Sequence, residues 1–226
     1  MVLLFLSISG CSRDSEFLNT MISLEDKQYR AERILPERIE KLKKEINRYE
    51  KEIKELAMMK RELGVLYKLL ASNYLNEKMF SEAVSELEEA IAIDSENPIL
   101  FYLRGVATAR LAKSIYNSDK KDIWEQAIWS YSRAIELDPS YVDALYGLSV
   151  LYVYELDRNR EAELLLEKIL QLERKNIDAM FVRALMFVNT ERPERALEQY
   201  DQIIQLSSSQ KHQDQALENK QLLESK

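Results

Sequence analysis

The sequence predicts an all-α fold built from a repeated helical hairpin, and two observations predict it. The 226 residues are 46% hydrophobic and 31% charged but include only four glycines and four prolines, too few turn residues for an all-β fold. Small residues also recur at helical spacings among large apolar ones in four successive segments. We therefore expect one hairpin design to be repeated along the chain.

Charge and composition exclude several classes of function. The net charge of -7 leaves little positive charge to neutralise phosphates, so a nucleic-acid partner is not expected. A single histidine, His212, and a single cysteine, Cys11, can form neither an intrachain disulfide nor a zinc-binding cluster. The sequence has neither a phosphate-binding glycine loop nor a nucleophile elbow. We expect no metal, no cofactor and no enzymatic activity.

An apolar run at the N-terminus, MVLLFLSISGC, ends in small residues followed by Cys11. It resembles a bacterial lipobox, in which the cysteine thiol is acylated, although the basic segment that normally precedes the run is missing. A start codon further upstream would explain that departure. The resemblance implies a signal-peptide remnant at 1–10, a palmitate-type lipid on Cys11 and a tether at 11–35. The alternative is an apolar N-terminus with a chance cysteine.

A lipidated Cys11 would hold the protein on a bacterial membrane, because more than one acyl chain gives stable anchoring. The apolar run itself is too short to span a bilayer as a helix. The resemblance implies a protein that faces the periplasm. The absence of an aspartate directly after the cysteine favours the outer membrane in the common sorting scheme.

A long charged helix is predicted for residues 36–63, since Pro36 can occupy a first helical turn and no breaker follows before Gly64. Its apolar residues alternate three and four apart, as in the narrow seam of a coiled coil. They are Ile39, Leu42, Ile46, Tyr49, Ile53 and Leu56, with Leu63 resuming the seam after Lys60. Two interpretations stay open: a homo-oligomer through residues 39–63, or a seam that packs back on its own chain.

Four segments of the chain align at their small residues. They are 64–97, 98–141, 142–176 and 177–210, with Ala71, Gly105, Ser149 and Ala184 at the eighth position. The second segment also shows Phe101, Ala127, Tyr131, Ala134 and Pro139. This pattern resembles the tetratricopeptide repeat family, whose signature is an aromatic, then Leu-Gly, Tyr, Ala, Phe, Ala and Pro at fixed offsets. The resemblance implies a right-handed superhelix of about four hairpins, closed by a capping helix at 211–226.

The small residues have a mechanical reason, since two helices approach closely only where one side lacks a bulky side chain. Two arginines, Arg104 and Arg183, depart from the family pattern because they stand at the usual leucine. The second segment also carries a ten-residue insertion, which should lengthen its helices or their loop. Trp124 and Trp129 lie beside the insertion, and we expect them to pack under it rather than form a recognition edge.

In this family the first helix of each hairpin lines a concave groove, and the corresponding positions here are mainly apolar and aromatic. They are Lys68, Tyr102, Val106, Arg110, Tyr146, Val150, Tyr154, Phe181, Leu185 and Asn189. A clamp for a C-terminal carboxylate is not expected, because Asp143 and Gly147 stand where such clamps place cations. We expect aromatic anchors to hold an apolar peptide or an amphipathic helix. In the alternative, the chain's own 37–63 helix or its terminal helix fills the groove.

Two classes of function follow from these expectations. The preferred one is a membrane-anchored lipoprotein that acts as a protein-binding scaffold in envelope assembly or transport, with one or more envelope proteins as partners. The other is a binder of small hydrophobic ligands, alone or as an oligomer, linked to a transport system. Among the aromatic residues, Tyr131 and Tyr152 are expected in the core, and Tyr146 is expected to face the partner.

Overall fold

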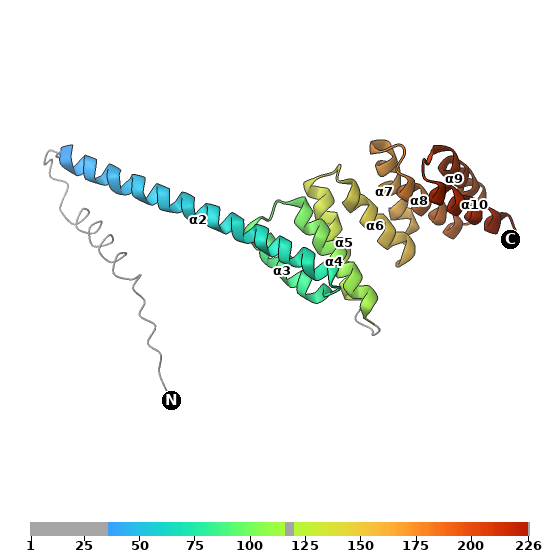
Figure 1. Cartoon of the computed structure of the whole chain (residues 1–226), viewed down its shortest axis with the longest axis horizontal. Helices are drawn as coiled ribbons and strands as arrows, with labels where there is room; N and C mark the ends of the chain where they lie inside the picture. The colour runs from blue at the N-terminus through green and yellow to red at the C-terminus, as the bar shows by residue number, and fades with distance from the viewer. Residues whose placement is uncertain (1–35, 116–119, 226) are drawn as a thin grey trace, which may run out of the picture. The chain divides into compact units, whose positions relative to one another are not determined.

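The computed structural model describes residues 36–115 and 120–225, and every regular element in these ranges is an α-helix (Figure 1). The all-α prediction is therefore confirmed. The chain divides into two units, Met1–Lys54 and Glu55–Lys226. The helices are α2 (Pro36–Asn76), α3 (Phe80–Ile93), α4 (Pro98–Ser114), α5 (Lys120–Leu137), α6 (Val142–Tyr154), α7 (Asn159–Leu172), α8 (Ile177–Asn189), α9 (Pro193–Leu206) and α10 (Gln210–Glu224).

Helix α2 does not end near Gly64, where the sequence suggested a boundary, but runs on to Asn76 as one helix of 41 residues. Gly64 serves close packing instead of termination. A Cβ at this position would lie 3.1 Å from Cγ2 of Ile93 at the end of α3. The missing side chain therefore lets the two helices approach, and the surrounding helix formers carry the backbone through a residue that costs about 1 kcal/mol relative to alanine.

The later helices pair as hairpins that follow one another along the chain (Figure 1). α4 packs on α5, α6 on α7 and α8 on α9, while α10 packs on α9 where a capping helix is predicted. The second helix of each hairpin also contacts the first helix of the next, as α5 contacts α6. In addition, α6 contacts both α4 and α8, so the first helices of successive hairpins lie side by side. This row of first helices carries the candidate site.

The small residues that predicted the repeat are buried at the helix contacts. Ala71, Ser149 and Ala184 are fully buried, and Gly105 is buried as well. The hydroxyl of Ser149 donates to the carbonyl oxygen of Tyr146 at 2.8 Å, so its polar group is satisfied inside the core. Close helix contact is therefore the physical role of these positions, as the sequence predicted.

The insertion lengthens both helices of its hairpin. α4 and α5 have 17 and 18 residues, whereas the helices from α6 to α9 have 13 or 14. Trp124 packs in the core with Ala112, as expected. The expectation for Trp129 is wrong, because its side chain is 55% exposed. Its ring meets the edge of Phe101 at 5.7 Å between centroids, and the guanidinium of Arg104 lies 5.5 Å from its centroid.

The two arginines that replace leucine hold neighbouring helices together by hydrogen bonds. Arg104 on α4 donates to Glu88 Oε1 of α3 at 2.6 Å through Nη2 and to Ser130 Oγ of α5 at 2.7 Å through Nη1. Arg183 on α8 donates to Gln199 Oε1 of α9 at 2.6 Å. Ser130 and Gln199 are buried, so each arginine supplies a partner to a polar side chain inside the stack.

Candidate functional site

Nine of the ten predicted groove residues form three rows on neighbouring helices, which we call the three rows. Each row has members four positions apart, so they share one helix face. The rows are Tyr102, Val106 and Arg110 on α4; Tyr146, Val150 and Tyr154 on α6; and Phe181, Leu185 and Asn189 on α8. All nine are half-buried or exposed rather than enclosed in the core. The structure therefore brings these nine onto adjacent helices, and partner binding there stays a prediction.

Aromatic contacts define the α4 end of the three rows. The Tyr102 ring meets Tyr141 edge-on at 5.3 Å between centroids and lies 6.2 Å from the ring of buried Tyr131. Burial raises the pKa of Tyr102, and the charge of Asp143 raises it further, while Arg110 opposes the shift. Burial also raises the pKa of Tyr141 to about 12. This end presents neutral phenol rings, which suit an apolar or aromatic ligand group.

Tyr141 was missed by the sequence analysis because it precedes α6 and lies outside the helical positions of the repeat. Its backbone N–H donates to the carbonyl oxygen of Asp138 at 3.1 Å, and Pro139 lies in the same turn. An aromatic residue two positions after that proline was the available signal. Tyr131, by contrast, is 4% exposed, which confirms its expected core position. Tyr152, expected in the core as well, is only half-buried.

A hollow of about 220 Å³ lies at the other end of the three rows. Tyr154 of α6 and Phe181 and Leu185 of α8 line it. The sequence analysis missed the wall that α10 adds, although its lining residues recur three and four apart. The remaining lining residues are Val188, Tyr200, Gln215, Asn219, Leu222 and Leu223.

The terminal helix therefore takes part in the candidate site. The ring of Phe181 meets the imidazole of His212 on α10 edge-on, with 6.0 Å between centroids. Phe181 also lies 6.5 Å from the ring of Tyr200. The helix α10 thus packs against one end of the three rows while a hollow stays open between it and α6 and α8.

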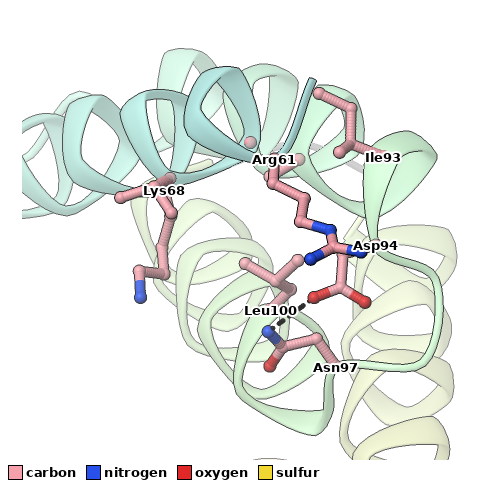
Figure 2. A pocket seen from close by; sticks show the side chains of 9 residues that line it. Arg61, Lys68, Ile93, Asp94, Asn97 and Leu100 are labelled. Atoms are coloured by element: carbon pink, nitrogen blue, oxygen red, sulfur yellow. Dashed lines mark hydrogen bonds between the residues drawn. The ribbon is translucent and has the colours of Figure 1, made fainter. Parts of the chain in front are cut away.

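Lys68, the tenth predicted residue, lies in a separate and more polar hollow of about 370 Å³. Figure 2 shows Arg61 and Lys68 projecting from α2 toward the turn that joins α3 and α4, where Asp94 and Asn97 lie. Asn97 Nδ2 donates to Asp94 Oδ2 at 3.0 Å, and Asn97 Oδ1 accepts from the backbone N–H of Ile99 at 3.1 Å. The amide of Asn97 therefore caps α4, and Lys68 does not share the aromatic hollow.

The polar members of the three rows differ in their engagement. Asn189 Nδ2 donates to the carbonyl oxygen of Val153 at 3.4 Å, which links the end of α8 to α6. Arg110 is exposed, and its charge acts on the phenols of Tyr102 and Tyr131. Arg110 and Asp143 therefore place opposite charges near Tyr102, rather than the cluster of cations that a carboxylate would need.

The described residues contain no grouping of three or more His, Cys, Asp or Glu side chains that could hold a metal ion. Within the same residues, no helix combines the length and apolar character needed to cross a bilayer. Cys11 and the predicted tether lie outside the described residues.

Two family models match the sequence at positions that fall within the predicted repeats. A model described as "Tetratricopeptide repeat" matches residues 66–97, and one described as "TPR repeat" matches residues 121–153. The chain carries tetratricopeptide repeats. The first match lies inside the segment 64–97, and the second joins α5 to α6 across a predicted repeat boundary. A sequence comparison with functionally curated proteins gave no match.

Solved tetratricopeptide repeat structures resemble this chain in fold. YrrB, a TPR protein with an unusual peptide-binding site, is 22% identical over 70% of this chain and 74% of its own, with a TM-score of 0.57. The thermophilic TPR protein TTC0263 of Thermus thermophilus is 18% identical over 67% of this chain and 78% of its own, with a TM-score of 0.59. MamA of Desulfovibrio magneticus is 19% identical over 64% and 76%, with a TM-score of 0.56.

Proposed function

We propose that this tetratricopeptide chain is a non-catalytic scaffold that binds a protein partner along the three rows. The partner is an extended apolar peptide or an amphipathic helix. One observation carries the proposal: aromatic and aliphatic side chains on three adjacent helices are left half-buried in continuous rows instead of being enclosed. Such rows match the spacing of anchor residues on a bound peptide or helix. The peptide-binding site of YrrB, a protein similar in fold, agrees with this choice.

The size of the aromatic hollow favours a peptide side chain over a whole small molecule. Its volume is about 220 Å³, below the range of roughly 300–1,000 Å³ that is typical of small-molecule sites. A hollow of this size suits one or two anchor side chains, with Tyr154 and Leu185 as its walls. The alternative, a binder of small hydrophobic ligands linked to a transport system, would need the hollow to be extended by an oligomer.

The partner site can be tested by affinity capture from detergent-solubilised bacterial envelopes. The chain with Tyr102→Ala and Tyr146→Ala should lose the proteins that the wild type recovers, since it lacks the anchors of two rows. Leu164→Ala is the matched control, because Leu164 is a 70% exposed apolar residue on α7, a helix that carries none of the three rows. Recovery of the same proteins by all three chains would refute the site. Circular dichroism checks that each variant is folded.

The location of the scaffold is proposed from the N-terminal resemblance to a lipobox. We place it on a bacterial membrane through lipid on Cys11, facing the periplasm, with the outer membrane favoured and an envelope protein as the partner. Radioactive palmitate should label the wild type and not Cys11→Ala. Equal labelling of the two chains would contradict the anchor.

Self-association is the second part of the proposal and uses a different surface. The predicted seam on α2 is exposed in the structure, with Ile53 and Leu56 at 65% and 67%. The seam therefore stays available for another helix, which favours a homo-oligomer through residues 39–63 over packing on its own chain.

A further inference from the structure

The exposed seam on α2 is longer than the sequence alone indicated. The alternation of three and four continues past Leu63 to Tyr67 and Leu70 within the same helix, and Lys60 is the one charged member. Leu63 and Leu70 are exposed at 44% and 39%, while Tyr67 is half-buried. A seam from Ile39 to Leu70 spans more than four heptads, the length at which such a pattern specifies a helical partner.

The two ends of the helix stack differ in how they meet solvent. The exposed side of α10 is mostly polar, with Gln210, Asp214 and Gln221 among its residues, as expected of a cap. On α2, in contrast, Leu66 and Leu69 are exposed at 61% and 53% beside the seam. A terminal helix with an apolar exposed face needs a covering partner to stay soluble. The seam makes another helix of the same heptad length the fitting cover.

Charges beside the seam decide how a second copy can approach. In a parallel pair, a residue just before one core position faces the residue just after the next core position on the partner helix. That arrangement would set Arg38 against Lys43 and Glu45 against Glu50, each twice by symmetry. Like charges at these positions repel and disfavour the parallel pair.

An antiparallel arrangement removes these like-charge contacts. The flanking positions of the C-terminal half of the seam are uncharged, and they would face the charged flanking positions of the N-terminal half of the second copy. The uncharged residues are Ala57, Met59, Gly64 and Leu66. The charged residues thus meet small or apolar neighbours while their ends reach solvent.

We propose that two copies of the chain pair antiparallel along α2, with the whole seam in register. Ile53 then faces Leu56 of the second copy, and Ile46 faces Leu63 of the second copy. The charged seam residue Lys60 faces Tyr49 of the second copy, where an ammonium can lie over an aromatic ring. The inference rests on the proposed self-association and adds its orientation and register; it does not depend on the three rows.

Cysteine cross-linking of the full chain tests the orientation. In a Cys11→Ala background, Ile46→Cys and Leu63→Cys are prepared separately, mixed, allowed to exchange and oxidised. The mixture should give a cross-linked dimer, and each variant alone should not. Within one helix these positions are about 26 Å apart, far beyond the reach of a disulfide. A mixture of Lys51→Cys and Met58→Cys is the matched control, because these positions lie at the same level on the outer face and should not link.

The outcomes separate the inference from the self-association on which it rests. Native mass spectrometry of the wild-type chain should show a dimer. A dimer mass with self-linking of the single variants, or without a link in the mixture, overturns the antiparallel register while self-association stands. A monomer at every concentration used overturns both. Equal linking in the control mixture would show unspecific collision and overturn the register as well.

Discussion

The phenol ring of Tyr131 fills the space that Gly105 leaves empty. A Cβ at Gly105 would lie 2.7 Å from Cδ1 of Tyr131, and a Cβ at Gly147 would lie 2.7 Å from its Cε1. The ring from α5 is thus held between the backbones of α4 and α6. Because Tyr131 is buried and has a glycine on both sides, it cannot move aside for an added methyl group.

Gly105→Ala should therefore destabilise the fold although alanine is the better helix former. The helix gains about 1 kcal/mol from the substitution, but overpacking against a ring that cannot move costs roughly 1–3 kcal/mol. We expect a net loss in the free energy of unfolding, measured by urea denaturation. Gly64→Ala is the comparison, since its 3.1 Å contact is with an Ile93 side chain that can shift, and it should lose less. Equal losses would show that the fixed ring is not the cause.

The two arginines at the usual leucine position should respond differently to leucine. Arg104→Leu leaves Ser130 satisfied, because its hydroxyl also donates to the carbonyl oxygen of Gln126 at 2.8 Å. Arg183→Leu leaves Gln199 Oε1 without the donor that it has at 2.6 Å, and Gln199 is 2% exposed. A buried polar atom without a partner costs roughly 1–3 kcal/mol.

The matched pair of substitutions is its own control. Melting of the two variants should show Arg104→Leu near the wild type and Arg183→Leu clearly below it. A replaced buried ion pair can be neutral when the new side chain packs well. The same loss in both variants would mean that the arginines stabilise mainly by their charge rather than by the buried partner.

Alkaline unfolding should depend on the phenol groups near Tyr102. Burial raises the pKa of Tyr141 to about 12, whereas an unfolded chain has its tyrosines near about 10. Below about pH 10 both states keep the proton, so the stability is unaffected. Between about pH 10 and 12 the unfolded chain loses the proton first, and the free energy of unfolding falls as the pH rises.

Tyr141→Phe removes this contribution, so its stability should fall less than that of the wild type between about pH 10 and 12. Urea midpoints at several pH values measure the difference. Tyr102 and Tyr131 also have pKa values raised by burial, so some alkaline loss should remain in the variant. Identical pH profiles for both chains would contradict the contribution of Tyr141.

The repeat itself was predictable because its signal is steric and local. A small residue at a fixed helical position is required wherever two helices touch, and Ala71 and Ala184 show it directly in the sequence. The three rows followed from the same frame. Trp129 was misplaced because an insertion changes which face of a helix meets a neighbour, and composition does not reveal this. The wall formed by α10 depends on tertiary packing of a helix that lies beyond the four predicted repeats.

The continuity of α2 through Gly64 was also beyond the sequence. Glycine is a helix breaker in isolation, but here its loss of propensity is offset by the approach of α3. The conflict between local preference and tertiary contact is decided by Ile93, which lies about thirty residues away in the chain. Neither the coiled-coil seam nor the repeat signature contains that contact.

Stacked repeats contact mainly their neighbours, so damage at one end should stay local. Ala216 is fully buried where α10 packs on α9. Ala216→Asp would bury a charge there, and the helix should detach rather than accept it. Amide hydrogen exchange should become fast in α10, rise moderately in α9 and stay unchanged in α4 and α5. Exchange that accelerates equally in all helices would show that the stack unfolds as one unit and contradict the nearest-neighbour description.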